Sequence, residues 1–203
     1  MYEAIKDKIA AATVDNPVTV AVLSQDATSA SVTGRSKGFA DEMYKLVTDA
    51  GQTAAVTGDY AAVNRGDESA AAVIIKVFVG ATPSSEDMTN AASGVLNTEN
   101  LLGVFCSNEG AVNGLLAAEN IGSTVPEGCA IVGFDAGAGQ KAAVRSGKFL
   151  GSITQDPFQI GYQAVALAVK ASNGEAVSDI DTGAKWYDSS NMDDEGIANL
   201  LYD

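Results

Sequence analysis

The chain of 203 residues contains no histidine, which excludes serine–histidine–aspartate and cysteine–histidine nucleophile systems and any histidine-ligated zinc site. Basic residues are also scarce, because 12 lysines and arginines stand against 26 aspartates and glutamates and leave a net charge of −14. A net charge of this sign repels the phosphates of nucleic acids and anionic membrane surfaces. The composition therefore argues against nucleic acid as a partner and against most hydrolase mechanisms.

Cysteine and long apolar runs are equally rare. Cys106 and Cys129 each lie beside an apolar run, so both are predicted to be buried core residues rather than a disulfide or a metal pair. No uninterrupted apolar run approaches the roughly 18 residues that a membrane-spanning helix needs. The N-terminal segment places Ile5 and Ile9 on one face, which is typical of an amphipathic helix and not of a secretory signal. We therefore expect any export signal to lie outside this chain.

Strands and helices are predicted to alternate along the chain. Hydrophobic residues make up 46% and aromatic residues 6%, which is the composition of an ordered protein rich in alanine and glycine. Apolar runs predict strands over residues 18–23, 72–80, 101–105, 129–135 and 149–154, with a weaker run at 54–56. Helical spacing predicts helices over residues 1–12, 38–50, 84–96, 110–120, 139–147 and 160–174. This alternation predicts an α/β fold with an open, mostly parallel sheet covered by helices on both faces.

Two segments carry no predicted element. Residues 24–34 are rich in serine and threonine and are predicted to form a polar loop after the first strand. Residues 175–203 form an acidic, mixed tail with an isolated Lys185–Tyr187 run and a last apolar set around Leu200.

Polar side chains follow the predicted strands. Ligands of open parallel sheets bind outside the carboxyl ends of the strands, and at these ends lie residues 24–26, 107–109, 135 and 154–155, of which Asn108, Asp135 and Gln155 would together form one polar surface. A carboxylate or an amide can meet two neighbouring hydroxyls of a sugar in bidentate fashion. Two of these residues have a structural alternative: Asn108 could cap the helix that begins near Gly110, and Asp135 could cap the turn before Gln140. Spacing alone does not choose between the two interpretations.

Four stretches together resemble the second half of a ribose-type (type I) periplasmic sugar-binding protein, the substrate-binding component of an ABC importer. In chain order they read VAVLSQDATSASVTGRSKGF, GVFCSNEGAVNG, AIVGFDAGAGQKAAVRSGKF and LGSITQDPFQIGYQAV. The SNE, GFD and TQDPFQIG motifs occur in the order that the family shows, and the resemblance covers the chain from Val18 to about Val177. It implies a Rossmann-like lobe of that family's fold.

The resemblance implies a set of ligand contacts and no catalytic residue, cofactor or metal. The arginine that grips ligand hydroxyls in this family falls on Arg35, which in isolation would be a solvated helix residue. The family's asparagine, aspartate and hinge glutamine fall on Asn108, Asp135 and Gln155. The family often adds an aromatic contact after the strand predicted over residues 72–80, but small residues stand there in this sequence. We therefore assign no aromatic contact.

The resemblance also implies a place for each part of the chain. Residues 1–16 would be a remnant helix of an otherwise absent first lobe, residues 17–154 the ligand-binding second lobe, and residues 155–203 the hinge crossover, a returning helix and the tail. The chain would then be a piece of a protein that lies outside the cytoplasm, in the periplasm or held by a lipoprotein anchor. The intact protein would deliver a sugar to an ABC transporter permease.

Two apolar helix faces are left without their expected partner lobe on this interpretation. Exposed apolar surface of that extent usually finds a partner. The two faces are therefore expected to pack on each other, or on a second copy of the chain. They consist of Ile5 and Ile9 in the first helix and of Ile160, Val165, Leu167 and Val169 in the later one.

Two other functions stay open as alternatives. The effector-binding core of a lactose-repressor-type transcription regulator shares the fold, but the negative net charge and the residues of the TQDPFQIG stretch favour the transporter. An enzyme that uses Asp26 or Asp135 as a general base is the third hypothesis. It has little support, because the sequence lacks histidine, a metal-ligand cluster and a phosphate-binding loop.

Overall fold

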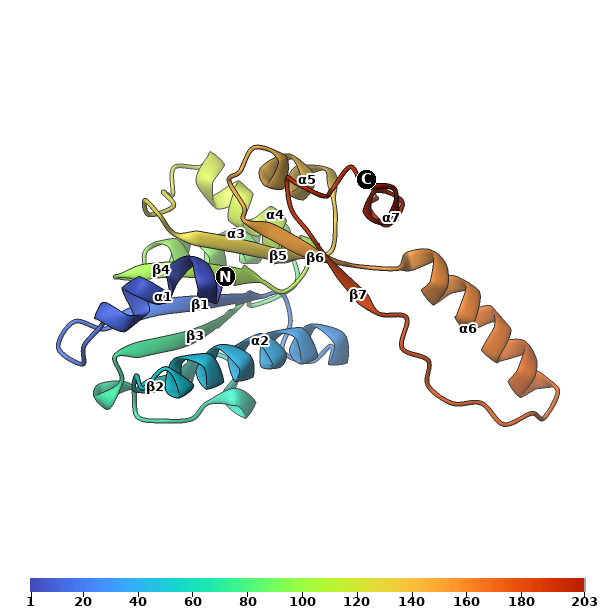
Figure 1. Ribbon diagram of the computed structural model, residues 1–203, viewed down its shortest axis with the longest axis horizontal. Coiled ribbons are helices and arrows are strands. Elements are labelled where there is room, and N and C mark those ends of the chain that lie inside the picture. The colour runs from blue at the N-terminus through green and yellow to red at the C-terminus, as the bar shows by residue number, and fades with distance from the viewer. Residues whose placement is uncertain (203) are drawn as a thin grey trace.

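The computed structural model describes residues 1–202, and its centre is a seven-stranded sheet in the order β2-β3-β1-β4-β5-β6-β7 (Figure 1). Six strands run parallel, and β7 pairs antiparallel with β6 at one edge. The strands are β1 (Val18–Ser24), β2 (Ala54–Gly58), β3 (Val73–Val79), β4 (Leu101–Cys106), β5 (Ala130–Phe134), β6 (Gly151–Gln155) and β7 (Ala184–Tyr187). The predicted α/β fold with a mostly parallel sheet is confirmed.

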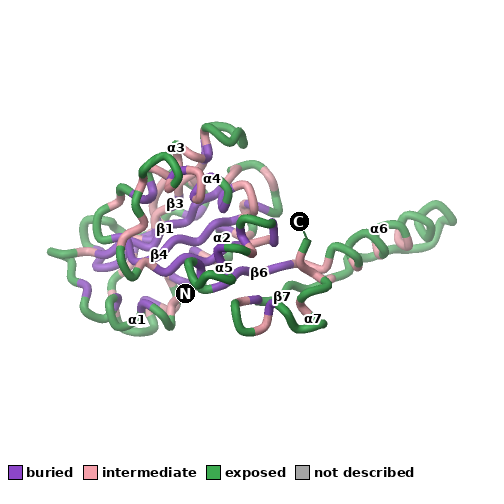
Figure 2. The backbone as a smooth tube through the Cα atoms, turned by 90° about the horizontal axis from the view of Figure 1, so that it is seen from above, coloured by how far each residue is buried: buried purple, intermediate pink, exposed green. Residues whose placement is uncertain are grey.

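Helices cover both faces of this sheet. One apolar cluster joins α1 and α2 to one face, and a second cluster joins α3, α4 and α5 to the other face. The helices are α1 (Tyr2–Ala11), α2 (Ala30–Asp49), α3 (Ser85–Leu96), α4 (Glu109–Asn120), α5 (Ala138–Arg145), α6 (Pro157–Ser172) and α7 (Glu195–Ala198), with short 3-10 turns at Ala61–Val63 and Glu68–Ala70. Figure 2 shows the buried residues concentrated in the strands between the two layers.

Helix α2 begins well before the predicted start at residue 38. The segment predicted to be a polar loop is helical from Ala30, and Val32 and Ser36 are buried on the same face as Met43. The serine and threonine hydroxyls that suggested a loop are satisfied within the helix, as when Thr33 donates to the carbonyl of Ser29 at 2.8 Å. The correction matters because the added turns carry Arg35.

Helix α1 is packed against the sheet of its own chain. Ile5 and Ile9 are each 1% exposed and share a cluster with Val20 and Met43. The expectation that this face packs on the later helix or on a second copy is therefore wrong. Period-3.6 spacing identified the apolar face correctly, but it could not tell which surface covers that face.

Helix α6 has the opposite environment and projects from the body of the molecule (Figure 1). None of its residues 157–172 is buried, and Phe158, Tyr162 and Val165 are 72%, 61% and 66% exposed. The chain then returns along the helix to form β7, so the tail from residue 173 passes back to the sheet edge (Figure 1). Among the described residues, no helix combines the length and apolarity needed to cross a bilayer.

The two cysteines are unpaired, as predicted. Cys106 is fully buried at the end of β4, and Cys129 is partly exposed just before β5. Burial raises the pKa of the Cys106 thiol far above its ordinary value and that of Cys129 to about 11. Both side chains are therefore neutral thiols near neutral pH, although Cys129 is less buried than the prediction had it.

Candidate functional site

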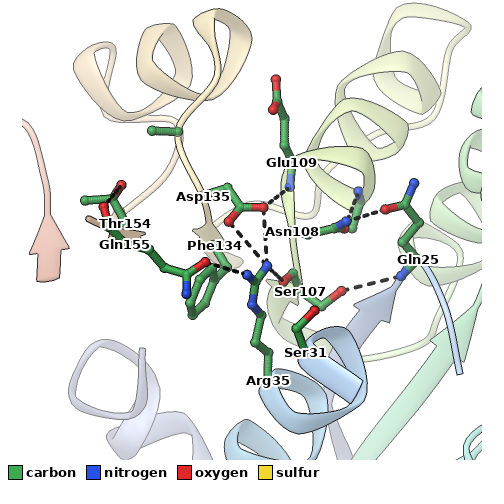
Figure 3. Close-up of polar contacts among 12 residues, drawn as sticks. Gln25, Ser31, Arg35, Ser107, Asn108, Glu109, Phe134, Asp135, Thr154 and Gln155 are labelled. Carbon is green, nitrogen blue, oxygen red and sulfur yellow. Dashed lines mark hydrogen bonds and ion pairs between the residues drawn. The ribbon is translucent and has the colours of Figure 1, made fainter. Parts of the chain in front are cut away.

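The candidate site lies at the carboxyl ends of the parallel strands, where α2 faces the loops that follow β1, β4, β5 and β6 (Figure 3). Asn108 and Asp135 directly follow the neighbouring strands β4 and β5, and Gln155 is the last residue of β6. Arg35 reaches the same edge from the second turn of α2. The four predicted site residues thus share one edge of the sheet.

Arg35 is the hub of the site. Its Nη1 lies 3.3 Å from each carboxylate oxygen of Asp135 and donates to the carbonyl of Ser107 at 3.2 Å. Its Nη2 donates to Oε1 of Gln155 at 2.8 Å, and its Cζ lies 3.8 Å from the centre of the Phe134 ring. A guanidinium that is hydrogen-bonded on two nitrogens and stacked on an aromatic face has little rotamer freedom left. The structure contradicts the interpretation of Arg35 as a solvated surface residue, because the side chain is 15% exposed.

Asp135 faces Arg35 from an uncommon backbone conformation. Its φ of 77° is in the left-handed region, which costs an ordinary residue about 1–2 kcal/mol, although aspartate tolerates it better than most. The carboxylate accepts from the backbone N–H of Glu109 at 3.1 Å, at the positive end of α4. The alternative role of Asp135 as a cap before Gln140 is wrong, because Gly137 is the N-cap residue of α5.

Asn108 caps helix α4 and also lies at the polar edge of the sheet. Its Oδ1 accepts from the N–H of Ala111 at 3.1 Å and caps α4, so the capping interpretation is confirmed. Its Nδ2 donates to Oε1 of Gln25, which leaves one N–H of the amide for another partner. Asn108 therefore lies beside the Arg35 network without contacting Arg35 (Figure 3).

Gln25 is a site residue to which the sequence assigned no contact. It follows β1, donates through Nε2 to the carbonyl of Pro83 at 3.3 Å, and accepts from Asn108. A side chain at position 110 would displace it, because a Cβ on Gly110 would lie 2.5 Å from its Nε2. The signal in the sequence was the position of Gln25 directly after the first predicted strand.

The hydrogen bonds fix which atoms the site offers to a ligand. The Gln155 Oε1 is turned toward Arg35, a pure donor, so the amide N–H groups of Gln155 are the free ones. The N–H of Ala111 likewise engages the Asn108 oxygen, so the amide group of Asn108 also has its N–H side left for a ligand. Arg35, Asn108 and Gln155 therefore offer N–H donors, and the Asp135 carboxylate offers acceptors. The carboxylate of Glu109 points away from this group (Figure 3).

Asp26 does not have the environment of a general base. Its carboxylate accepts from the N–H and the hydroxyl of Thr28 and from the N–H of Ser29. These hydrogen bonds, led by that of the Thr28 backbone, lower the pKa of Asp26 below its usual value. The residue forms the turn that precedes α2. Within residues 1–202, no three side chains of histidine, cysteine, aspartate or glutamate gather where a metal ion could bind.

Polar side chains gathered at the carboxyl ends of a parallel α/β sheet lie where open α/β folds bind their ligands. A family model described as the periplasmic binding protein domain matches residues 1–176. The chain belongs to this family, and the resemblance seen in the sequence is confirmed at that level.

Solved structures show the same fold. A Brachyspira murdochii protein described as an ABC transporter and LacI family transcriptional regulator is 38% identical, with a TM-score of 0.80 over 100% of this chain and 61% of its own. An ABC transporter solute-binding protein of Agrobacterium vitis with bound D-fucose is 23% identical, with a TM-score of 0.70 over 98% of this chain and 60% of its own. A Mycobacterium smegmatis protein in complex with β-D-fucofuranose is 22% identical, with a TM-score of 0.65 over 97% of this chain and 59% of its own.

The chain thus spans about three fifths of the length of these structures. A comparison with curated proteins finds no match.

Proposed function

We propose that this lobe binds a monosaccharide or a sugar-like polyol as part of a solute-binding protein that serves an ABC importer. The observation that carries the proposal is the group formed by Arg35, Asp135 and Gln155 at the strand ends, with Asn108 beside it. The family of the chain and the sugars bound in the solved structures of the same fold support it.

The donor and acceptor pattern of the site suits vicinal hydroxyls. One hydroxyl can donate to the Asp135 carboxylate while it accepts from an N–H of Arg35, and its neighbour can accept from an amide N–H of Asn108 or Gln155. Hydrogen bonds to charged groups are the stronger ones, and here both charges are held in place before a ligand arrives. The proposed role is capture and release of the sugar, and the site requires no covalent step, cofactor or metal.

Tight binding requires a second surface that encloses the sugar. Ordinary ligand pockets enclose most of the ligand within roughly 300–1,000 Å³, and the solved structures of this fold are longer than this chain, which spans about three fifths of their length. We propose that residues 17–154 form one jaw of a two-lobed clamp and that residues 155–203 belong to the crossover toward the other jaw. The chain alone is then expected to bind sugars weakly, with millimolar dissociation constants.

The proposal extends to location and contacts. A member of this family is expected to act outside the cytoplasmic membrane, in the periplasm or on a lipid anchor, with a transporter permease as its partner. The exposed face of α6, with Phe158, Tyr162 and Val165, is a contact surface on this proposal. A chain that lacks the partner lobe would self-associate through it.

A second candidate function is the effector-binding core of a transcription regulator. The description of the Brachyspira murdochii protein, which names both a transporter and a LacI family regulator, is the observation that favours it. The net charge of −14 opposes a position next to DNA. Binding of the intact protein to permease-containing membranes, and not to promoter DNA, distinguishes the two.

The test is an NMR titration of the ¹⁵N-labelled chain with D-fucose, D-arabinose, D-tagatose and D-ribose, because this method detects millimolar affinity. At least one sugar is expected to shift the signals of Arg35, Asn108 and Gln155 together, saturably. The variant Asp135→Ala should abolish these shifts, whereas Asp193→Ala, which removes an exposed carboxylate paired with Arg145, should preserve them. Shifts that appear for no sugar, or that survive Asp135→Ala, would remove the proposed function.

A further inference from the structure

The peptide group of Asp135 is held by hydrogen bonds to residues outside the candidate site. Its carbonyl oxygen accepts from Gln140 Nε2 at 3.0 Å, from Ser152 Oγ at 3.1 Å and from the Tyr187 hydroxyl at 3.1 Å. Its N–H donates to the carbonyl of Ile153 at 2.7 Å. Hydrogen bonds at both ends thus oppose relaxation of a φ that would otherwise be unfavourable.

The three donors are fully buried, and two glycines make room for them. Gln140 and Ser152 are 0% exposed, as is Tyr187. A Cβ on Gly133 would lie 2.5 Å from Gln140 Nε2 and 3.1 Å from Ser152 Oγ. A Cβ on Gly151 would meet the carbonyl oxygen of Tyr187 at 2.5 Å. A larger side chain at position 133 or 151 would therefore displace the groups that hold the Asp135 carbonyl.

Tyr187 connects the C-terminal segment of the chain to the site. It lies on β7, opposite Ser152 in the antiparallel register, and it is the buried residue of that four-residue edge strand. Its burial raises the pKa of its hydroxyl to about 12, so the group stays a hydrogen-bond donor at any physiological pH. The same segment reaches the site a second time, because Tyr202 accepts from the N–H of Ala136 at 3.3 Å.

We propose that Tyr187 is a positioning residue for the sugar site. Its hydroxyl fixes the Asp135 carbonyl, and the Asp135 carboxylate is thereby held toward the Arg35 guanidinium and the Glu109 N–H. Loss of this hydroxyl removes one of the three donors to the Asp135 carbonyl, so the peptide is held less firmly in the left-handed region and the carboxylate shifts relative to its two donors. The effect on sugar affinity rests on the proposed function, but the effect on the Arg35–Asp135 pair does not.

The test compares Tyr187→Phe with the matched control Tyr162→Phe, which removes a hydroxyl from a tyrosine that is 61% exposed on α6. The sugar-free readouts are the NMR signals of the Arg35 side chain and of the Glu109 amide. The second readout is the affinity for D-fucose, the sugar in one of the solved structures of this fold. We expect Tyr187→Phe to move both signals and to weaken binding about tenfold, the usual size for one lost buried hydrogen bond, while Tyr162→Phe changes neither.

The outcomes separate this proposal from the proposed function. If the two signals move although even the unaltered chain binds none of the sugars tested, Tyr187 positions Asp135 and the sugar-binding function is wrong. If Tyr187→Phe folds and leaves both signals unchanged, the positioning role is overturned, whatever happens to the affinity. If Tyr187→Phe does not fold, Ser152→Ala, which removes another donor to the same carbonyl, decides the question through the same two signals.

Discussion

Two surfaces of this molecule are organised in opposite ways. At the strand ends, polar side chains that could face water are paired with one another, and Arg35 and Asp135 are 15% and 19% exposed. On α6, apolar side chains that could be buried lie in water, with Phe158 72% and Val165 66% exposed. The polar surface is paired without any ligand, whereas the apolar face of α6 is exposed and is proposed above to be covered by a partner. On the proposed function, ligand contacts and lobe contacts would therefore belong to separate parts of the chain.

The largest expected effect comes from removing the hub of the polar surface. Arg35→Ala leaves Asp135 and Gln155 without their shared donor, so sugar affinity should fall at least about a hundredfold, as when one partner of a shielded charge pair is truncated. Arg145→Ala, which breaks an exposed ion pair with Asp193, is the matched control and should leave affinity unchanged. Calorimetric or NMR titration measures both. If Arg35→Ala binds the sugar as tightly as Arg145→Ala does, the Arg35–Asp135 pair is unrelated to sugar binding.

The second prediction compares two apolar helices by their effect on folding. Ile9→Ala on the covered helix α1 should lower the free energy of unfolding by about 2–5 kcal/mol, the range for a truncated core residue. Val165→Ala on α6 should change it by less than about 0.5 kcal/mol, since the side chain is mostly in water. Urea unfolding followed by circular dichroism gives both values. A large loss for Val165→Ala would mean that α6 is covered in solution.

The third prediction tests whether Asn108 offers a hydrogen-bond donor to the ligand. Asn108→Asp keeps an oxygen that caps α4 but replaces the N–H donor with an acceptor, so it should weaken sugar binding about tenfold while stability changes little. Asn97→Asp, at the exposed C-cap of α3, serves as the control for the added charge. Tighter binding by Asn108→Asp would reverse the assignment of donors and acceptors at the site.

The smallest effect concerns the pH dependence of stability. The pKa of Tyr187 is raised to about 12 from 10.0 by burial, so the folded state keeps a proton that the unfolded state loses. The contribution of Tyr187 to the free energy of unfolding is therefore constant below pH 10, and this free energy should decline as the pH rises from 10 toward 12. Tyr187→Phe should show a shallower decline. Urea midpoints measured across this pH range check the slope, and identical slopes would place Tyr187 in contact with water.

The sequence predicted the sheet and the site edge because both depend on local pattern. Apolar runs located β1, β3 and β4, and the rule that ligands bind at strand ends brought Asn108, Asp135 and Gln155 together. Assigning Arg35 needed the family resemblance, because a lone arginine on a polar segment is ordinarily solvated.

Features that depend on tertiary contacts could not be predicted from the sequence. The start of α2 was missed because serine and threonine favour loops unless their hydroxyls bond within a helix. Strand β7 was missed because it is four residues long, and Tyr187 alone is buried in it. The three donors to the Asp135 carbonyl come from positions 140, 152 and 187, and no spacing rule connects such distant residues.

The most direct test of the account is a crystal structure of this chain grown with a saturating sugar from the titration. Sugar hydroxyls should lie within hydrogen-bond distance of the Asp135 carboxylate and the Arg35 guanidinium, with the Arg35–Gln155 bond retained. A sugar bound elsewhere, or a site in which Arg35 and Asp135 stay paired while the sugar occupies the apolar face of α6, would contradict it.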